Sequence, residues 1–118
     1  MRTLLGFLTL LFYFSSSFAN SPITQRIPQF SNDKVNVWQT IIFPSEKQKL
    51  TPHRHENDRV VVALDDGELQ VTNEKGESHL LKLSKNNAYF LEKDVPGNLH
   101  TDINLTNHPI RVMVIELK

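Results

Sequence analysis

The chain has 118 residues, with 13 Lys and Arg against 13 Asp and Glu, and it contains no cysteine. This balance excludes the strongly basic surface that binds nucleic acid, and no basic helix indicates a membrane surface. Without cysteine there is no disulfide framework, so the core, a metal or a partner chain must stabilise the fold. We therefore expect a small-molecule ligand or substrate, a metal ion or another protein chain as the partner.

The first 19 residues have the pattern of a secretory signal peptide. Arg2 carries their only charge, residues 4–14 are apolar, and the small residues Ser17 and Ala19 precede an expected cleavage after Ala19. The apolar run is shorter than the roughly 20 residues that a membrane-spanning helix needs, which disfavours a retained anchor. Cleavage leaves 99 residues (118 − 19) with 12 Lys and Arg (13 − 1) against 13 Asp and Glu. We expect a periplasmic or secreted protein with no stable membrane insertion.

The mature chain is expected to form one domain of short strands. Residues 20–33 are polar, contain two prolines, and indicate an N-terminal arm or first loop before a barrel domain at residues 34–118. Strands are expected at 34–43, 50–55, 59–64, 68–72, 79–83, 88–91, 99–105 and 110–117, and the run at 34–43 is rich in β-branched and aromatic residues. Gly, Asn, Asp and Pro separate them, and no segment has a helical period. This spacing predicts an all-β sandwich or barrel.

Three of the separating segments predict specific turns. Residues 65–68 are expected to form a hairpin turn in which Gly67 takes a positive φ angle, and residues 73–76 a second hairpin turn. Asn86 and Asn87 can adopt a left-handed turn without glycine.

Three histidines indicate a metal site. His53 and His55 lie one residue apart in an extended run, so they point to the same face of a strand. His100 lies 45 residues further on (100 − 55), in another predicted strand. If the sheet curls into a small barrel, the three imidazoles can converge on one divalent ion, and neutral imidazole suits Fe, Mn, Ni, Cu and Zn alike. His79 and His108 lie at predicted turns and are expected to face solvent.

These residues resemble the two motifs of the cupins. The first family motif runs Gly, five residues, His-x-His, three or four residues, Glu, six residues, Gly, and His53, His55 and Gly67 match it. The second runs Gly, five residues, Pro-x-Gly, two residues, His, three residues, Asn, and its last three named positions match Gly97, His100 and Asn104. The resemblance covers nearly all of the mature chain and implies a double-stranded β-helix, or jelly-roll barrel.

The chain departs from the motifs at several positions. Lys47 and Tyr89 stand at the leading glycines, Val95 stands at the proline, and Arg59 or Val60 stands at the glutamate. In the family that glutamate is a metal ligand. Its loss leaves a divalent ion with three neutral imidazoles at a charge of +2, which weakens the affinity for hard ions and favours an anionic or chelating substrate.

The missing glutamate leaves the roles of three polar residues open. Period-two alternation puts Asp102 on the face of His100, and Arg59 lies on a strand that should cross the same cavity. Arg59 and Asp102 could pair in the pocket, Asp102 could serve as a substitute fourth ligand, or Arg59 could extend to solvent with Asp102 at the barrel mouth. Asn104 could line the cavity or hydrogen-bond a neighbouring loop.

The resemblance implies several functions. A metal in the barrel could act as a Lewis acid or dioxygen-reacting centre, in dioxygenase-type or isomerase-type chemistry on a small organic acid, keto compound or sugar. Cupins also include metal-free binders, so a non-catalytic small-molecule-binding module and a dimeric structural or partner-binding domain remain alternatives. Whether the protein is an enzyme stays open, and no residue is assigned a catalytic role. Residues 60–64 and 112–115 are apolar on both faces, which predicts a homodimer.

Overall fold

A computed structural model describes residues 24–44 and 52–118. The expected signal peptide and its cleavage site lie outside these residues, as do Lys47 and the start of the strand expected at 50–55. The described chain forms eight strands: β1 (Gln25–Ser31), β2 (Val35–Ile42), β3 (Arg59–Ala63), β4 (Gly67–Asn73), β5 (Ser78–Leu83), β6 (Ala88–Leu91), β7 (His100–Asn104) and β8 (Ile110–Leu117). No helix able to cross a membrane occurs in this part of the chain.

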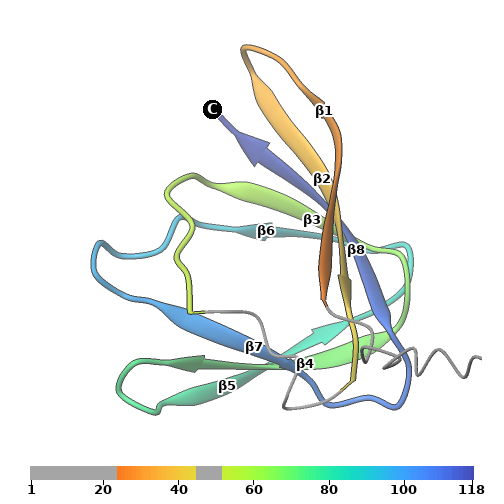
Figure 1. The fold of residues 1–118 in the computed structure, drawn as a ribbon, viewed down its shortest axis with the longest axis vertical. Coiled ribbons are helices and arrows are strands. Elements are labelled where there is room, and N and C mark those ends of the chain that lie inside the picture. The colour runs from red at the N-terminus through yellow and green to blue at the C-terminus, as the bar shows by residue number, and fades with distance from the viewer. Residues whose placement is uncertain (1–23, 45–51) are drawn as a thin grey trace, which may run out of the picture.

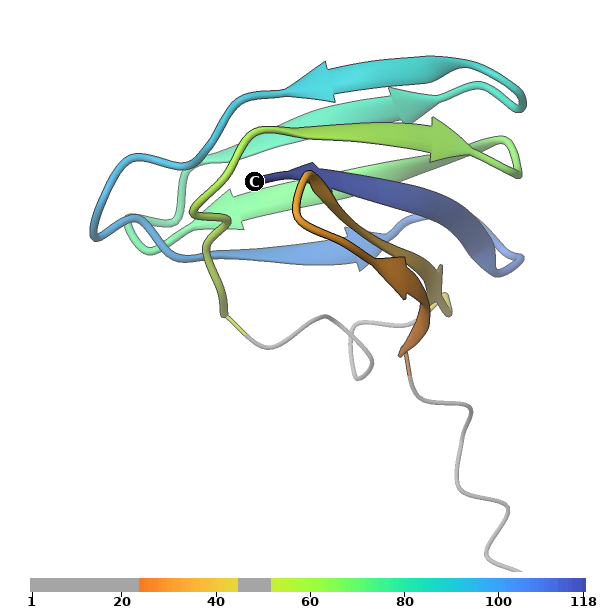
Figure 2. The ribbon, with the colours of Figure 1, turned by 90° about the horizontal axis from the view of Figure 1, so that it is seen from above.

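The strands form two antiparallel sheets. One sheet has the order β1-β2-β8-β3-β6 and the other has the order β5-β4-β7. Figure 1 shows the smaller sheet lying across from the larger one, and Figure 2 shows the same layers from above. The chain crosses between the sheets after β3, β5, β6 and β7, so neighbours in sequence are often not neighbours in a sheet. The predicted all-β double-sheet barrel is confirmed.

Apolar side chains from both sheets fill the space between them. Trp38, Val61 and Val114 come from the larger sheet, and Leu69 and Leu83 come from the smaller one; all are buried. On β3 and β8 the buried residues alternate with partly exposed ones, as period-two geometry requires for a strand with one face on the core.

Residues 25–31, expected as part of an arm or first loop, form the edge strand β1. It pairs with β2, and all seven of its residues are exposed. Pro28 is tolerated because an edge strand pairs on one side only and does not need every backbone N–H for hydrogen bonds. The register with β2 shifts between Pro28 and Phe30, as in a β-bulge. A fully exposed strand lacks alternating buried residues, which explains why the sequence pattern missed it.

The hairpin predicted at residues 65–68 is wrong, because β3 and β4 belong to different sheets. The segment is a corner, and Gly67 begins β4 without a positive φ angle. Glycine is needed there for close packing, since a Cβ atom at Gly67 would lie 2.3 Å from Cδ1 of Ile110. The other two turns are confirmed: Gly76 (φ 79°) turns β4 into β5, and Asn86 has a φ of 68°.

Candidate metal centre

His53 and His100 are placed opposite each other by their backbones. The N–H of His53 donates to the carbonyl of His100 at 3.0 Å, and the N–H of His100 donates to the carbonyl of His53 at 2.8 Å. This reciprocal antiparallel bridge attaches the segment before β3 to the free edge of β7. Directly opposed residues in such a bridge project their side chains to the same face. The two imidazoles therefore start from adjacent points on one surface.

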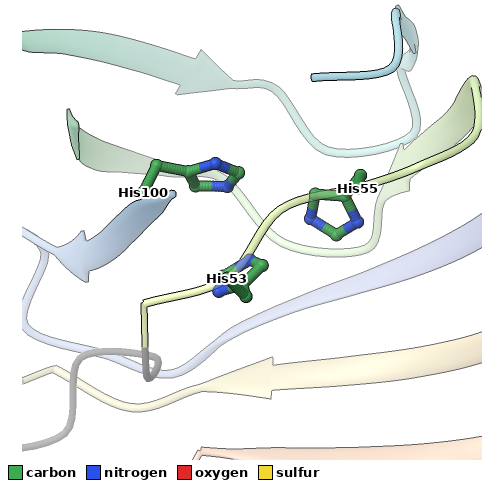
Figure 3. A group of neighbouring side chains, drawn as sticks. All are labelled: His53, His55 and His100. Carbon is green, nitrogen blue, oxygen red and sulfur yellow. The ribbon is translucent and has the colours of Figure 1, made fainter. Parts of the chain in front are cut away.

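His55 reaches the same surface because it lies two residues beyond His53 in extended chain. Figure 3 shows the rings of His53 and His55, from the segment leading into β3, and of His100, from β7, grouped together. The ring centroid of His53 lies 4.9 Å from that of His55 and 4.5 Å from that of His100. The structure thus brings together the three histidines that the sequence spacing singled out.

The donor set of the three histidines fits a divalent transition metal. One ring nitrogen from each histidine lies within 4.8 Å of the other two. Two imidazole nitrogens bonded to one ion at about 2.1 Å lie no more than about 4.2 Å apart. Small side-chain rotations would therefore suffice to close the three nitrogens on an ion, and imidazole is a suitable ligand for Zn, Cu, Fe and Ni.

Asp94, in the segment between β6 and β7, connects two of the three histidines. Its Oδ2 accepts the backbone N–H of His55 at 2.6 Å and lies 3.4 Å from Nδ1 of His100. The Asp94 N–H in turn donates to the His55 carbonyl at 2.8 Å. A carboxylate beside Nδ1 favours the tautomer that leaves Nε2 free to bind a metal. No pattern in the sequence marks Asp94, because it lies in a loop without periodicity.

Asp102 lies on the other side of the imidazoles. Its Oδ2 is 3.7 Å from Nε2 of His53 and 3.9 Å from Nε2 of His100. Burial raises the pKa of the Asp102 carboxyl, while His100, His53 and Arg59 act in the opposite direction. A cation between the histidines would stabilise the ionised carboxylate. Asp102 lies near two of the histidines but does not belong to the group whose ligand atoms converge, so its role as a substitute fourth ligand stays a prediction.

Burial also favours the neutral form of His55 and His100. It is the largest cause that lowers the pKa of His55 to about 3, and the charge of Arg59 is the second. The pKa of His100 is lowered mainly by burial as well, although Asp102 opposes this. A neutral imidazole is the form that binds a metal, so these two rings need not lose a proton first.

Arg59 is neither paired with Asp102 nor extended to solvent. Its side chain is buried, and no contact within 4.0 Å joins the two described side chains. The guanidinium donates from Nη1 to the carbonyl of Glu92 at 3.4 Å. Asp102 faces the histidines instead, so the expected Arg59–Asp102 pair and the solvent-exposed alternative are both wrong. The sequence could not exclude this pair, because period-two alternation gives the face of a residue but not its neighbours across strands.

Asn104 hydrogen-bonds to neighbouring loop backbone and does not line the cavity. Its amide donates to the carbonyls of Ile42 and His108 at 2.8 Å each, and its Oδ1 accepts the N–H of Thr106. Of the two roles considered for Asn104, the structure shows the loop contact. His79 and His108 are exposed as expected, and His108 Nε2 bonds to the carbonyl of Asp66.

A cavity of about 740 Å³ extends from the histidines into the barrel. Its lining includes the three histidines and Arg59, Asp94 and Asp102 at one end. Apolar side chains of both sheets, among them Val61, Leu69 and Val114, line the cavity together with further polar and charged residues. The volume suits a small organic molecule.

Solved structures resemble this architecture along most of the chain. A cupin domain from Bordetella pertussis Tohama I is 27% identical, with a TM-score of 0.71 over 82% of this chain and 95% of that chain. An RmlC-like cupin with a double-stranded β-helix fold from Methanocaldococcus jannaschii is 13% identical, with a TM-score of 0.61 over 83% of each chain. A protein with a double-stranded β-helix domain from Klebsiella pneumoniae is 16% identical, with a TM-score of 0.60 over 82% and 78%.

The fold is that of the cupins. No protein-family model matches the sequence, and no functionally curated protein matches it. The agreement therefore lies in the double-sheet barrel. In this cupin barrel the three histidines that match the family motifs converge, whereas the motif glutamate is replaced.

Proposed function

We propose that this protein is an exported cupin that binds one divalent transition metal through His53, His55 and His100 and acts on a small molecule in the barrel cavity. The observation that carries the proposal is the convergence of one ring nitrogen from each histidine within 4.8 Å of the other two. The lowered pKa values of His55 and His100 add support, because they keep both rings in the ligand form.

In this proposal the surrounding residues have distinct roles. The three histidines would hold the ion, Asp94 would orient His100, and Asp102 would offer a carboxylate oxygen beside His53 and His100. A bound metal would supply Lewis-acid or redox chemistry of the kind found in dioxygenases and isomerases. The cavity of about 740 Å³ would hold the organic acid, keto compound or sugar next to the histidines. Export rests on the signal-like residues 1–19.

The metal content of alanine variants, purified without an affinity tag and reconstituted with metal, tests the proposal. We expect His53→Ala, His55→Ala and His100→Ala each to lose most of the metal. The matched controls His79→Ala and His108→Ala should retain it, because His79 and His108 do not belong to the converging group. Equal metal retention in all five variants would overturn the assignment.

One observation favours a second function, a metal-free binding module. The buried guanidinium of Arg59 lowers the pKa of His55. A positive charge therefore already acts on the imidazole that would bind the metal ion. A cation that disfavours a proton on His55 also disfavours a metal ion there unless an anion lies between them. Wild-type protein that takes up no metal on reconstitution, yet binds small molecules in the cavity, would establish this second function.

A further inference from the structure

The guanidinium of Arg59 is buried and has few hydrogen-bond partners among the described residues. Arg59 is the first residue of β3, and its side chain is only 8% exposed at the wall of the cavity. A guanidinium carries five N–H donors, but the hydrogen bond to the Glu92 carbonyl, at 3.4 Å, is long. No carboxylate of the described residues lies within 4.0 Å of it. Asp94, Asp102 and Glu116 act on its charge only from a greater distance. Buried charges are normally paired directly, so a direct partner from the cavity is expected.

The neighbours of Arg59 on its sheet face are mostly apolar. Leu91 lies directly opposite it on β6, and Val61 lies two residues along β3 on the same face. Glu116 lies opposite on β8 and does not line the cavity. A ligand that reached Arg59 would therefore place its charged group on the guanidinium and its body against aliphatic side chains.

The charges along the cavity limit the charge of this ligand. Four acidic residues and three basic residues line it: Glu77, Glu92, Asp94, Asp102, Arg26, Arg59 and Lys93. A dianion such as phosphate would be repelled by the carboxylates around it. A single carboxylate matches the two parallel N–H groups of a guanidinium and carries only one charge.

We propose that Arg59 binds the carboxylate of the ligand, and that this ligand is an organic acid with one carboxylate and an apolar body. This assignment names the ligand class of the proposed function. It rests on that function only for the contact between the ligand and a bound metal, because the anion site at Arg59 needs no metal. Arg59 occupies a slot that holds glutamate in the family motif. The ligand carboxylate would thus contact the guanidinium directly, which Asp94 and Asp102, beside the histidines, do not do.

Binding to metal-free protein tests the anion site separately from the metal site. Wild-type protein treated with a chelator is titrated calorimetrically with benzoate and with the neutral isostere benzamide. We expect benzoate to bind at least tenfold more tightly, because a charge-assisted pair is lost with the amide. Along a series from butanoate to hexanoate, affinity should rise about fourfold per methylene. Inorganic phosphate should bind more weakly than benzoate.

Substitution then assigns the site to Arg59. Arg59→Met should lower benzoate affinity at least tenfold and leave benzamide affinity unchanged. Arg111→Met is the matched control, because Arg111 pairs with Asp65 outside the cavity, and it should behave like wild type. The proposal is overturned if benzoate and benzamide bind equally, if phosphate binds more tightly than benzoate, or if both arginine variants lose benzoate alike. If Arg59→Met does not fold, the wild-type comparison alone decides.

Metal analysis of the same preparations separates the two proposals. A wild-type protein that binds benzoate but takes up no metal would refute the metal site and keep the anion site. A protein that takes up metal but shows no preference for benzoate in either form would refute the anion site and keep the metal site.

Discussion

At the scale of single residues, Asp94 is the polar group that organises the histidines. It accepts the N–H of His55 and lies beside Nδ1 of His100. Replacing it by asparagine keeps the shape and removes the charge. We expect Asp94→Asn to weaken metal affinity about 10- to 100-fold, as is typical for residues that orient metal ligands. Competition with a chelator of known affinity measures this.

Asp58→Asn is the control for that substitution. The Asp58 carboxylate also accepts a backbone N–H in the same region, that of Lys93 at 2.8 Å, but makes no hydrogen bond or ion pair with His55 or His100 among the described residues. Its substitution should leave metal affinity nearly unchanged. Equal losses in both variants would mean that loop stability, and not the orientation of His100, determines the affinity.

The lowered pKa of His55 predicts how the metal-free protein responds to acid. The ring takes up a proton near pH 6.5 in the unfolded chain but only near pH 3 in the folded one. Between these values the unfolded state binds more protons, so the free energy of unfolding falls as the pH is lowered. The slope should be a fraction of the roughly 1.4 kcal/mol per pH unit for one proton, because solvent still reaches the ring.

Urea denaturation of chelator-treated protein at pH 7 and pH 5 measures this slope. His55→Gln removes the titrating ring and should flatten the pH dependence. His100 acts in the same direction, since its pKa is also lowered, so some dependence should remain. A wild-type midpoint that does not change between the two pH values would contradict the burial of His55.

The residue scale also shows which parts of the site the sequence could predict. The grouping of His53, His55 and His100 follows from strand periodicity and from the spacing of the motifs, both of which are local patterns. The environment of Arg59 does not follow, because it depends on which side chains lie close across strands. Asp94 could not be predicted from the sequence, because the fold and not a periodic pattern positions a loop residue.

At the scale of elements, the corner between β3 and β4 depends on close packing at Gly67. A methyl group at this position would meet Ile110, which is fully buried. We expect Gly67→Ala to lower the free energy of unfolding by about 1–3 kcal/mol, the usual cost of overpacking. Urea denaturation of this variant measures the effect.

A double-mutant cycle identifies the cause of that loss. Ile110→Ala alone should destabilise the protein by about 2–5 kcal/mol, because it empties a buried site. Combined with Gly67→Ala, the total cost should be less than the sum, since the added methyl then occupies vacated space. Strict additivity would show that contact with Ile110 is not the reason for glycine.

Seven of the eight described strands could be predicted because each contains apolar residues in a short segment bounded by turn residues. The exposed strand β1 has no such run and is held by pairing with β2. The pairing of strands was less predictable than their existence. A short connection rich in Asp and Gly indicates a hairpin, yet the three residues 64–66 carry the chain from β3 to β4 in the other sheet.

At the scale of the whole molecule, the larger sheet carries a row of apolar residues across its five strands, with exposed aromatic side chains at both ends. Phe90, Val60, Ile115, Val37 and Phe30 are directly opposed across the five strands, one from each. Phe90 is 59% exposed and Phe30 is 58% exposed. We propose that two copies of the chain pair through this row, because such a row is costly to leave in water.

Light scattering at micromolar concentration tests the dimer and should give twice the mass of one chain. Phe30→Lys should shift the protein toward monomer. Leu80→Lys is the matched control, because Leu80 is equally exposed (59%) but lies in the other sheet. A wild-type protein that has only monomer mass would remove this proposal.

The central claim is that His53, His55 and His100 hold one metal ion in the barrel. Anomalous X-ray diffraction from crystals of tag-free protein reconstituted with zinc, measured on both sides of the zinc absorption edge, locates such an ion directly. A metal ion held by the three histidines should give a single peak at about 2.0–2.1 Å from one ring nitrogen of each. No peak between them, or a peak held by other side chains, would contradict the claim.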